Sequence, residues 1–159
     1  MHCMEEQHER QKVGAYLRRV CDLTSPNLPR FDEFRCDCRQ NRTIPVLLTP
    51  WEDGHAIVSE SVTALSKDIS NRGLSVTLPS PFRAAEVVVG IWLPDAFEAR
   101  EPRFILGATR QNVPIGGGFW ALGIEATQLI FNGDTAELLP VAKSRLQVPQ
   151  NESMLLPTL

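Results

Sequence analysis

The hydrophobic pattern of the chain begins with one helical segment. Four apolar residues fall at positions i, i+3, i+4 and i+7, so that they lie on one face of an α-helix: Val13, Tyr16, Leu17 and Val20. This spacing predicts a helix over residues 5–22, and Pro26 and Pro29 lie just past its end, where they would stop it. We expect the apolar face of this helix to pack on the rest of its own chain.

From Arg42 onward the apolar residues follow the pattern of short β-strands. Leu74, Val76 and Leu78 alternate with polar or small residues, which is the two-residue period of a half-buried strand. Six strands are predicted in all, at residues 44–48, 57–65, 74–78, 87–93, 104–108 and 119–126. Short strands separated by turn residues favour an antiparallel barrel or sandwich, and hence a mainly β fold.

The segments between and after the strands complete the predicted organisation. Residues 112–118 are rich in proline and glycine and predict a turn between the last two strands. Asp134-Thr135 would cap a short helix from Ala136, which Pro140 limits. The chain is therefore expected to comprise an N-terminal helical extension at residues 1–30, one β-domain at 31–142 and a C-terminal tail at 143–159, of which 147–159 are expected to be loosely ordered.

Composition narrows the class of protein. The chain has 159 residues, a formal net charge of −3, 43% hydrophobic and 22% charged residues, which is ordinary for one globular domain and excludes wholesale disorder. A slight excess of acidic residues disfavours a general nucleic-acid binder, whose affinity depends on neutralising phosphates. The N-terminus is polar, and no stretch approaches the roughly 18–20 apolar residues of a membrane span. We therefore expect a cytoplasmic protein.

Signatures of catalysis or of metal binding are few. The sequence has no nucleophile elbow, no zinc-protease motif and no phosphate-binding glycine loop. His55 stands alone after Asp53-Gly54, in a turn, where a solvated side chain is far more common than a general base. The spacing of the four cysteines, Cys36 and Cys38 among them, does not suit a zinc site, and reduced thiols fit the expected compartment. We predict no catalytic residues, no metal and no resident cofactor.

Two stretches carry recognisable chemistry. The segment from Arg35 to Arg42 holds three arginines just before the first predicted strand. The second stretch, Asp68 to Gly73, has the form Asp-x-Ser-x-x-Gly and leads directly into the strand at 74–78. An arginine fork bonds a phosphate or a guanine edge through two hydrogens at once, whereas aspartate accepts hydrogen bonds from a guanine. Together these groups suit a ligand that bears both phosphates and guanines.

The two stretches resemble the PilZ domain family, the bacterial receptors for cyclic di-GMP. That family has Arg-x-x-x-Arg before its first strand and Asp/Asn-x-Ser-x-x-Gly before a later one, and the segment from Leu122 to Glu125 looks like its Gly-x-Glu-bearing strand. The resemblance covers about residues 35–131. It implies a single six-stranded antiparallel β-barrel and a non-enzymatic receptor that signals through a protein partner or a homo-oligomer. The ligand-binding residues that it implies are Arg35, Arg39, Arg42, Asp68, Ser70 and Gly73.

The arginine stretch departs from the family pattern in one respect. Arg35 and Arg39 have the required spacing, but they lie three residues further from the strand than usual. Cys38 stands four residues before Arg42, where the pattern expects an arginine. Two interpretations therefore stay open: a cyclic di-GMP receptor, or a degenerate PilZ-like interaction module that binds no nucleotide. In the second, the stretch from Asp68 to Gly73 is simply a turn, with Gly73 in the left-handed conformation.

Overall fold

The computed structural model describes residues 2–23, 40–92, 101–130 and 136–146. Its helices and strands, in chain order, are α1 (His2–Leu23), β1 (Gln40–Asn41), β2 (Pro45–Glu52), β3 (His55–Ala56), β4 (Val62–Ser70), β5 (Gly73–Leu78), β6 (Glu86–Ile91), β7 (Arg103–Gly116), β8 (Phe119–Ile130) and α3 (Leu138–Leu146), with a single 3-10 turn at Val58–Glu60. The predictions for Arg35, Cys36, Cys38, Arg39, Asp134-Thr135 and the tail after residue 146 concern residues outside the described ranges.

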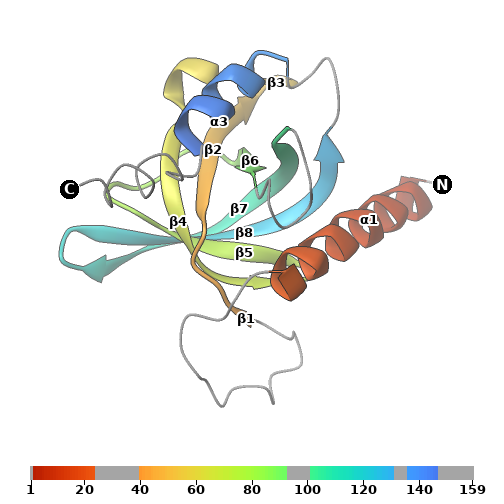
Figure 1. The fold of residues 1–159 in the computed structure, drawn as a ribbon, viewed down its shortest axis with the longest axis horizontal. Helices are drawn as coiled ribbons and strands as arrows, with labels where there is room; N and C mark the ends of the chain where they lie inside the picture. The colour runs from red at the N-terminus through yellow and green to blue at the C-terminus, as the bar shows by residue number, and fades with distance from the viewer. Residues whose placement is uncertain (1, 24–39, 93–100, 131–135, 147–159) are drawn as a thin grey trace, which may run out of the picture.

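The strands form a closed antiparallel barrel (Figure 1). Hydrogen-bonded neighbours follow the order β4-β5-β8-β7-β6-β2, and β2 pairs again with β4, which closes the circle of six. The short strand β1 pairs with β4, and the short strand β3 pairs with β2. The predicted mainly β fold, with six barrel strands, an N-terminal helix and a short C-terminal helix, is confirmed.

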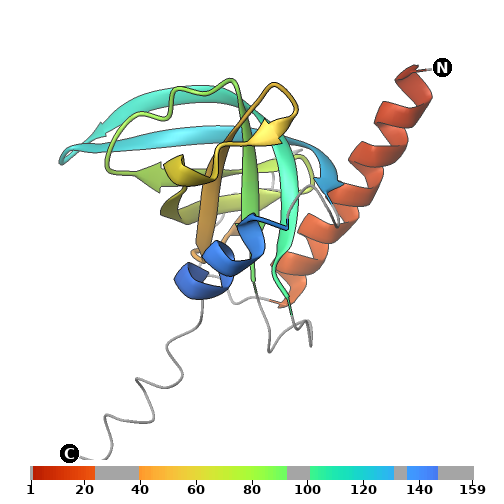
Figure 2. The ribbon, with the colours of Figure 1, turned by 90° about the horizontal axis from the view of Figure 1, so that it is seen from above.

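The N-terminal helix packs against the barrel, as the apolar spacing predicts. Val13, Leu17 and Val20 are fully buried in one cluster with the side chains of the barrel interior, and Tyr16 is packed beside them. Figure 2 shows the C-terminal half of α1 against the barrel and its N-terminal half extending beyond it. Because Gly14 has no side chain, the helix approaches the backbone of Asn71 closely: a Cβ atom at Gly14 would stand 2.7 Å from the Asn71 carbonyl oxygen.

A second core lies outside the barrel, under α3. Leu138, Ala142 and Leu146 of α3 are buried against outward-facing residues of the barrel, namely Leu47, Val88, Phe104, Leu106 and Ile130. Strands β2 and β6 are thus buried on both faces. That explains the almost continuous apolar run at 87–93, since a strand covered on both sides needs no polar alternation.

Three predicted boundaries were wrong. Strand β2 does not end at Pro50 but runs to Glu52, because Pro50 lies opposite Val87 and its carbonyl accepts a hydrogen bond from Ile57 N–H (2.8 Å). The run at 57–65 is not one strand; a turn of 3-10 helix precedes β4. The turn predicted at 112–118 shrinks to the glycines at 116–118, all with positive φ, because the two flanking strands continue into a long hairpin.

Candidate functional site

The stretch from Asp68 to Gly73 joins β4 to β5. Asp68 and Ser70 lie within β4, so the turn itself is only Asn71 and Arg72. The buried Ser70 hydroxyl oxygen accepts a hydrogen bond from the Arg72 N–H (3.1 Å), which fixes this tight turn. The prediction that Asp68 belongs to the turn was wrong, because Asp68 pairs with Ser75 in the ladder after a β-bulge at 66–68.

Asp68 carries a half-satisfied carboxylate. Its Oδ2 accepts a hydrogen bond from the Ser75 hydroxyl (3.3 Å). Its Oδ1 is buried and has no hydrogen-bond partner within the described part of the chain. A buried acceptor without a partner is costly and therefore uncommon in folded proteins. Asp68 thus keeps one buried acceptor for which the described residues provide no donor.

Gly73 plays a different part from the one predicted. It is not among the described glycines with positive φ, so the expected left-handed conformation was wrong. Its lack of a side chain is required by β8 instead. A Cβ atom at Gly73 would overlap the carbonyl oxygen of Ile124 in the neighbouring strand. Glycine therefore permits close pairing of β5 with β8.

Asp68, Ser70 and Gly73 line a single open cleft of about 540 Å³ on the barrel surface, which we call the Asp68 cleft. Its walls come from β4, β5, β7, β8 and the turn at 71–72. The charged residues that line it are Lys67, Arg72 and Arg110, against Asp68 and Glu125. With three basic and two acidic groups, the cleft suits an anionic ligand that also carries hydrogen-bond donors.

Glu125 links this cleft to α1. Its Oε1 accepts bonds from the Arg110 Nε and Nη2 atoms (2.7 and 2.6 Å), and its Oε2 accepts one from Arg10 of α1 (2.5 Å). The hydrogen bonds from Arg110, with those from Arg10, lower the pKa of the Glu125 carboxyl, although partial desolvation opposes the shift. Glu125 is therefore a carboxylate held between two guanidinium groups.

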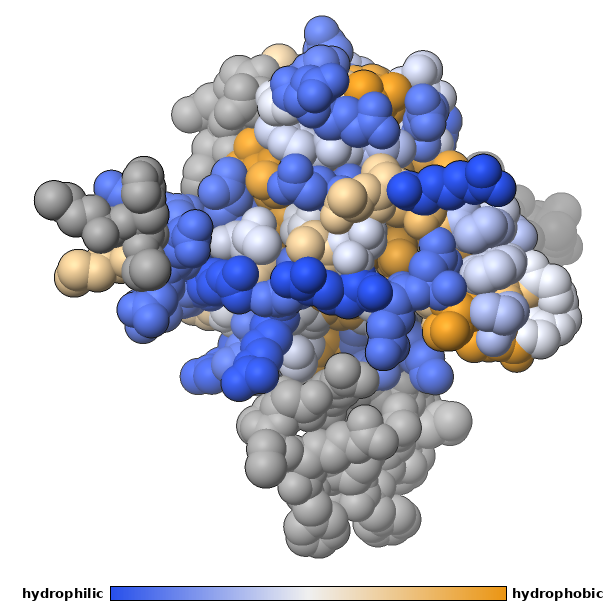
Figure 3. Space-filling view, turned by 180° about the vertical axis from the view of Figure 1, so that it is seen from behind, coloured by the Kyte–Doolittle hydropathy of each residue, from blue (hydrophilic) through white to orange (hydrophobic). Residues whose placement is uncertain are grey.

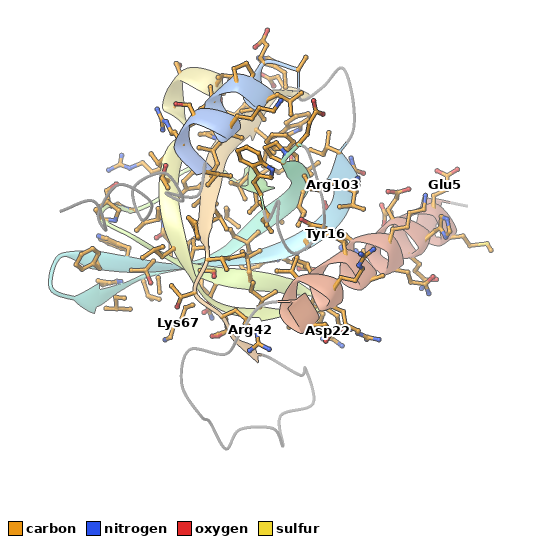
Figure 4. The ribbon with its side chains drawn as sticks, viewed as in Figure 1. Glu5, Tyr16, Asp22, Arg42, Lys67 and Arg103 are labelled. Atoms are coloured by element: carbon orange, nitrogen blue, oxygen red, sulfur yellow. The ribbon has the colours of Figure 1, made fainter. Side chains whose placement is uncertain are left out.

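Arg42, the one predicted arginine among the described residues, borders this cleft but does not line it. Arg42 is 7% exposed, and its Nε and Nη2 atoms donate to the Cys21 carbonyl at the end of α1 (3.1 and 3.0 Å). Figure 4 shows Arg42 at the carboxyl end of the helix. Its N–H also donates to the carbonyl of Lys67, a residue of the cleft (3.2 Å). Arg42 thus joins helix α1 to the cleft wall.

Sequence reasoning missed the pair of Arg110 and Glu125. They come from β7 and β8, and no local spacing connects them. One signal was present in the sequence, since Glu125 is the single charged residue in the strand from Phe119 to Ile130. A charged residue in such a strand indicates a specific partner.

Two further features bear on the class of site. No group of three His, Cys, Asp or Glu side chains that could hold a metal ion occurs within the described residues. Neither described helix is long and apolar enough to cross a membrane. The Cys21 thiol is buried and donates to the Ile69 carbonyl (3.6 Å), and desolvation raises its pKa, so it is a poor nucleophile in this state.

Among known proteins, the chain has a distant structural likeness and no match by sequence. No family model matches the sequence, and no curated protein matches it. Among solved structures, the chain is similar to the Bacillus subtilis inhibitor of motility, MotI/DgrA, at 20% identity and a TM-score of 0.44. The match covers 74% of this chain and 52% of the other, so the chain spans about half the length of that structure. A likeness this distant assigns neither a family nor a function to the chain.

Proposed function

We propose that the chain is a non-enzymatic receptor domain that binds cyclic di-GMP in the Asp68 cleft. The observation that supports the proposal is Asp68 itself: its Oδ1 is buried and lacks a hydrogen-bond partner within the described residues, and the residue lines a cleft together with Lys67, Arg72 and Arg110. The N1–H and N2–H groups of a guanine are neighbouring donors that a carboxylate accepts together. The basic side chains suit the phosphates of the same ligand.

The arginines before the barrel complete the proposed site. Arg35 and Arg39 precede β1, which pairs with β4 opposite Asp68. Because Asn41 of β1 pairs with Asp68 beside the cleft, we propose that Arg35 and Arg39, a few residues earlier in the sequence, fold over a bound ligand. Arg42 contributes by anchoring the start of this segment to α1. Signal output would pass to a protein partner.

The Asp68 carboxylate is the first test. Asp68→Asn removes one of two carboxylate oxygens and should weaken cyclic di-GMP binding at least tenfold, since each charge-assisted bond contributes about 1.5–3 kcal/mol. Titration calorimetry measures this, with Asp53→Asn as the matched control, because Asp53 lies on an exposed turn away from the cleft. Equal affinity in both variants would contradict the proposed site. Wild-type protein that binds no cyclic di-GMP would contradict the function.

Cys38 provides a second test. Because it occupies the position where an arginine is expected, we predict micromolar or weaker affinity for the wild-type chain. Cys38→Arg should then tighten binding about tenfold, through one more charge-assisted contact to phosphate. Cys36→Arg adds the same charge two residues away and is the control. If both variants bind alike, the gain is a general effect of charge and the spacing is irrelevant.

One surface feature is compatible both with the receptor and with the alternative, an interaction module without nucleotide. The β7–β8 hairpin projects from the barrel, and its tip exposes Val113, Ile115 and Phe119, each about half accessible (Figure 3). A projecting apolar tip is typical of a contact surface for another protein. A receptor needs such a surface as well, so the calorimetric titration with cyclic di-GMP separates the two functions.

A further inference from the structure

Glu125 stands between two hollows of the surface. One is the Asp68 cleft. The other, of about 660 Å³, lies between α1 and the turn at 71–72, and the residues that line it include Arg10, Gly14, Asn71 and Glu125. Glu125 lines both hollows, and its carboxylate reaches Arg110 on the cleft side and Arg10 on the helix side. A change in the ion-pair partners of Glu125 therefore alters the charge lining both hollows.

The carboxylate of Glu125 opposes an anionic ligand in two ways. It occupies the guanidinium of Arg110, which a phosphate entering the cleft would otherwise bind through the same fork geometry. It also places a negative charge at the cleft wall, which repels phosphate. Arg10 partly neutralises this negative charge, and it remains an ion-pair partner of Glu125 when Arg110 binds the ligand.

Arg10 reaches Glu125 because α1 is held in place nearby. Gly14, one helical turn further on, sits against the Asn71 carbonyl, and the neighbouring Val13 is buried in the core. The Arg10 side chain is itself 49% exposed, and an ion pair at such a site adds little to folding stability. The contact is thus better suited to tuning the cleft than to holding the fold.

We propose that Glu125 competes with phosphate for Arg110, and that Arg10 moderates this competition, so that anion binding and docking of α1 reinforce each other. The proposal rests on the proposed function for the identity of the ligand. When phosphate takes Arg110, Glu125 keeps Arg10 as its partner among the described residues, and the contact between barrel and helix tightens. Reciprocity of coupled equilibria then requires that the docked helix raise the affinity for the anion.

The experiment is a double-mutant cycle measured by titration calorimetry at low ionic strength, with cyclic di-GMP and inorganic pyrophosphate as separate probes. Glu125→Gln should tighten binding and Arg10→Ala should weaken it, each by roughly two- to fivefold, as expected for a partly exposed charge pair. Arg10→Ala combined with Glu125→Gln should bind like Glu125→Gln alone, because no carboxylate is left to offset. Lys12→Ala is the control, since it also removes one positive charge from α1, but Lys12 pairs with the exposed Glu9 of the same helix and not with Glu125.

Hydrogen exchange of α1 supplies a second readout. Saturating cyclic di-GMP should slow exchange of the α1 amides in the wild-type chain, and this protection should disappear in Arg10→Ala. Cyclic di-GMP affinities that are equal in wild type, Glu125→Gln and Arg10→Ala would overturn the inference and leave the proposed function standing. Pyrophosphate binding that follows the cycle, with no binding of cyclic di-GMP, would overturn the proposed function alone.

Discussion

Gly73→Ala is expected to lower the free energy of unfolding by about 3 kcal/mol or more, or to prevent folding. The added methyl group would overlap the carbonyl oxygen of Ile124, and that oxygen belongs to a strand paired with β5 along its whole length. Relief requires β5 and β8 to separate, which breaks ladder hydrogen bonds at the barrel wall. Urea unfolding followed by circular dichroism measures the loss.

Gly123→Ala is the matched control for this prediction. Gly123 lies on β8 beside the same cleft, but a Cβ atom there would meet only Gln111 at 3.8 Å, an ordinary contact distance. We expect its stability to be unchanged or slightly raised, since alanine has less conformational freedom to lose on folding. Equal losses in the two variants would show that glycine at these positions matters for the chain in general and not for the approach to β8.

Arg42→Ala is expected to cost about 2–3 kcal/mol of folding stability, even without ligand. The last carbonyls of a helix lack partners within the helix, and Arg42 gives the Cys21 carbonyl two donors and a positive charge at the negative end of the helix dipole. Without Arg42, that buried carbonyl loses both donors. The C-terminal turns of α1 should then exchange their amide hydrogens faster, which mass spectrometry measures.

Arg83→Ala, at an exposed position before β6, is the control and should leave stability within about 0.5 kcal/mol of the wild type. Arg42→Lys offers the carbonyl a single charged donor and should give an intermediate loss. A variant of Arg42 with wild-type stability but no affinity for cyclic di-GMP would show that Arg42 contacts the ligand directly. In that case its bond to the helix would be dispensable.

The fold could be predicted largely from residue periodicity. The helix spacing at Val13, Leu17 and Val20 and the alternation at Leu74, Val76 and Leu78 reflect one-sided burial, which each segment records in its own sequence. Boundaries were less predictable. Whether Pro50 ends a strand depends on its pairing with Val87 in the neighbouring strand. The length of the β7–β8 hairpin likewise depends on the pairing of its two strands with each other.

The candidate site was only partly predictable, because its groups come from four strands and a helix. The sequence singled out Asp68, Ser70 and Gly73, which are close together in the chain, and these do line one cleft. It did not reveal that Asp68 Oδ1 is buried without a hydrogen-bond partner among the described residues, since burial of a single atom depends on the surrounding strands. Nor did it pair Arg110 with Glu125 and Arg10, three residues that only the antiparallel ladder and the docked helix bring together.

By itself, the sequence determined the class of fold, the helix face that is buried and the position of the Asp-x-Ser-x-x-Gly stretch, because these are local patterns of polarity and chain conformation. The tertiary structure decided what those residues do. It makes Gly73, predicted as a left-handed turn residue, a point of close strand contact, and it gives Arg42, whose contact with a ligand stays a prediction, two hydrogen bonds to the Cys21 carbonyl. In both cases the deciding neighbour lies at least 21 residues away in the chain, so that only packing brings it into contact.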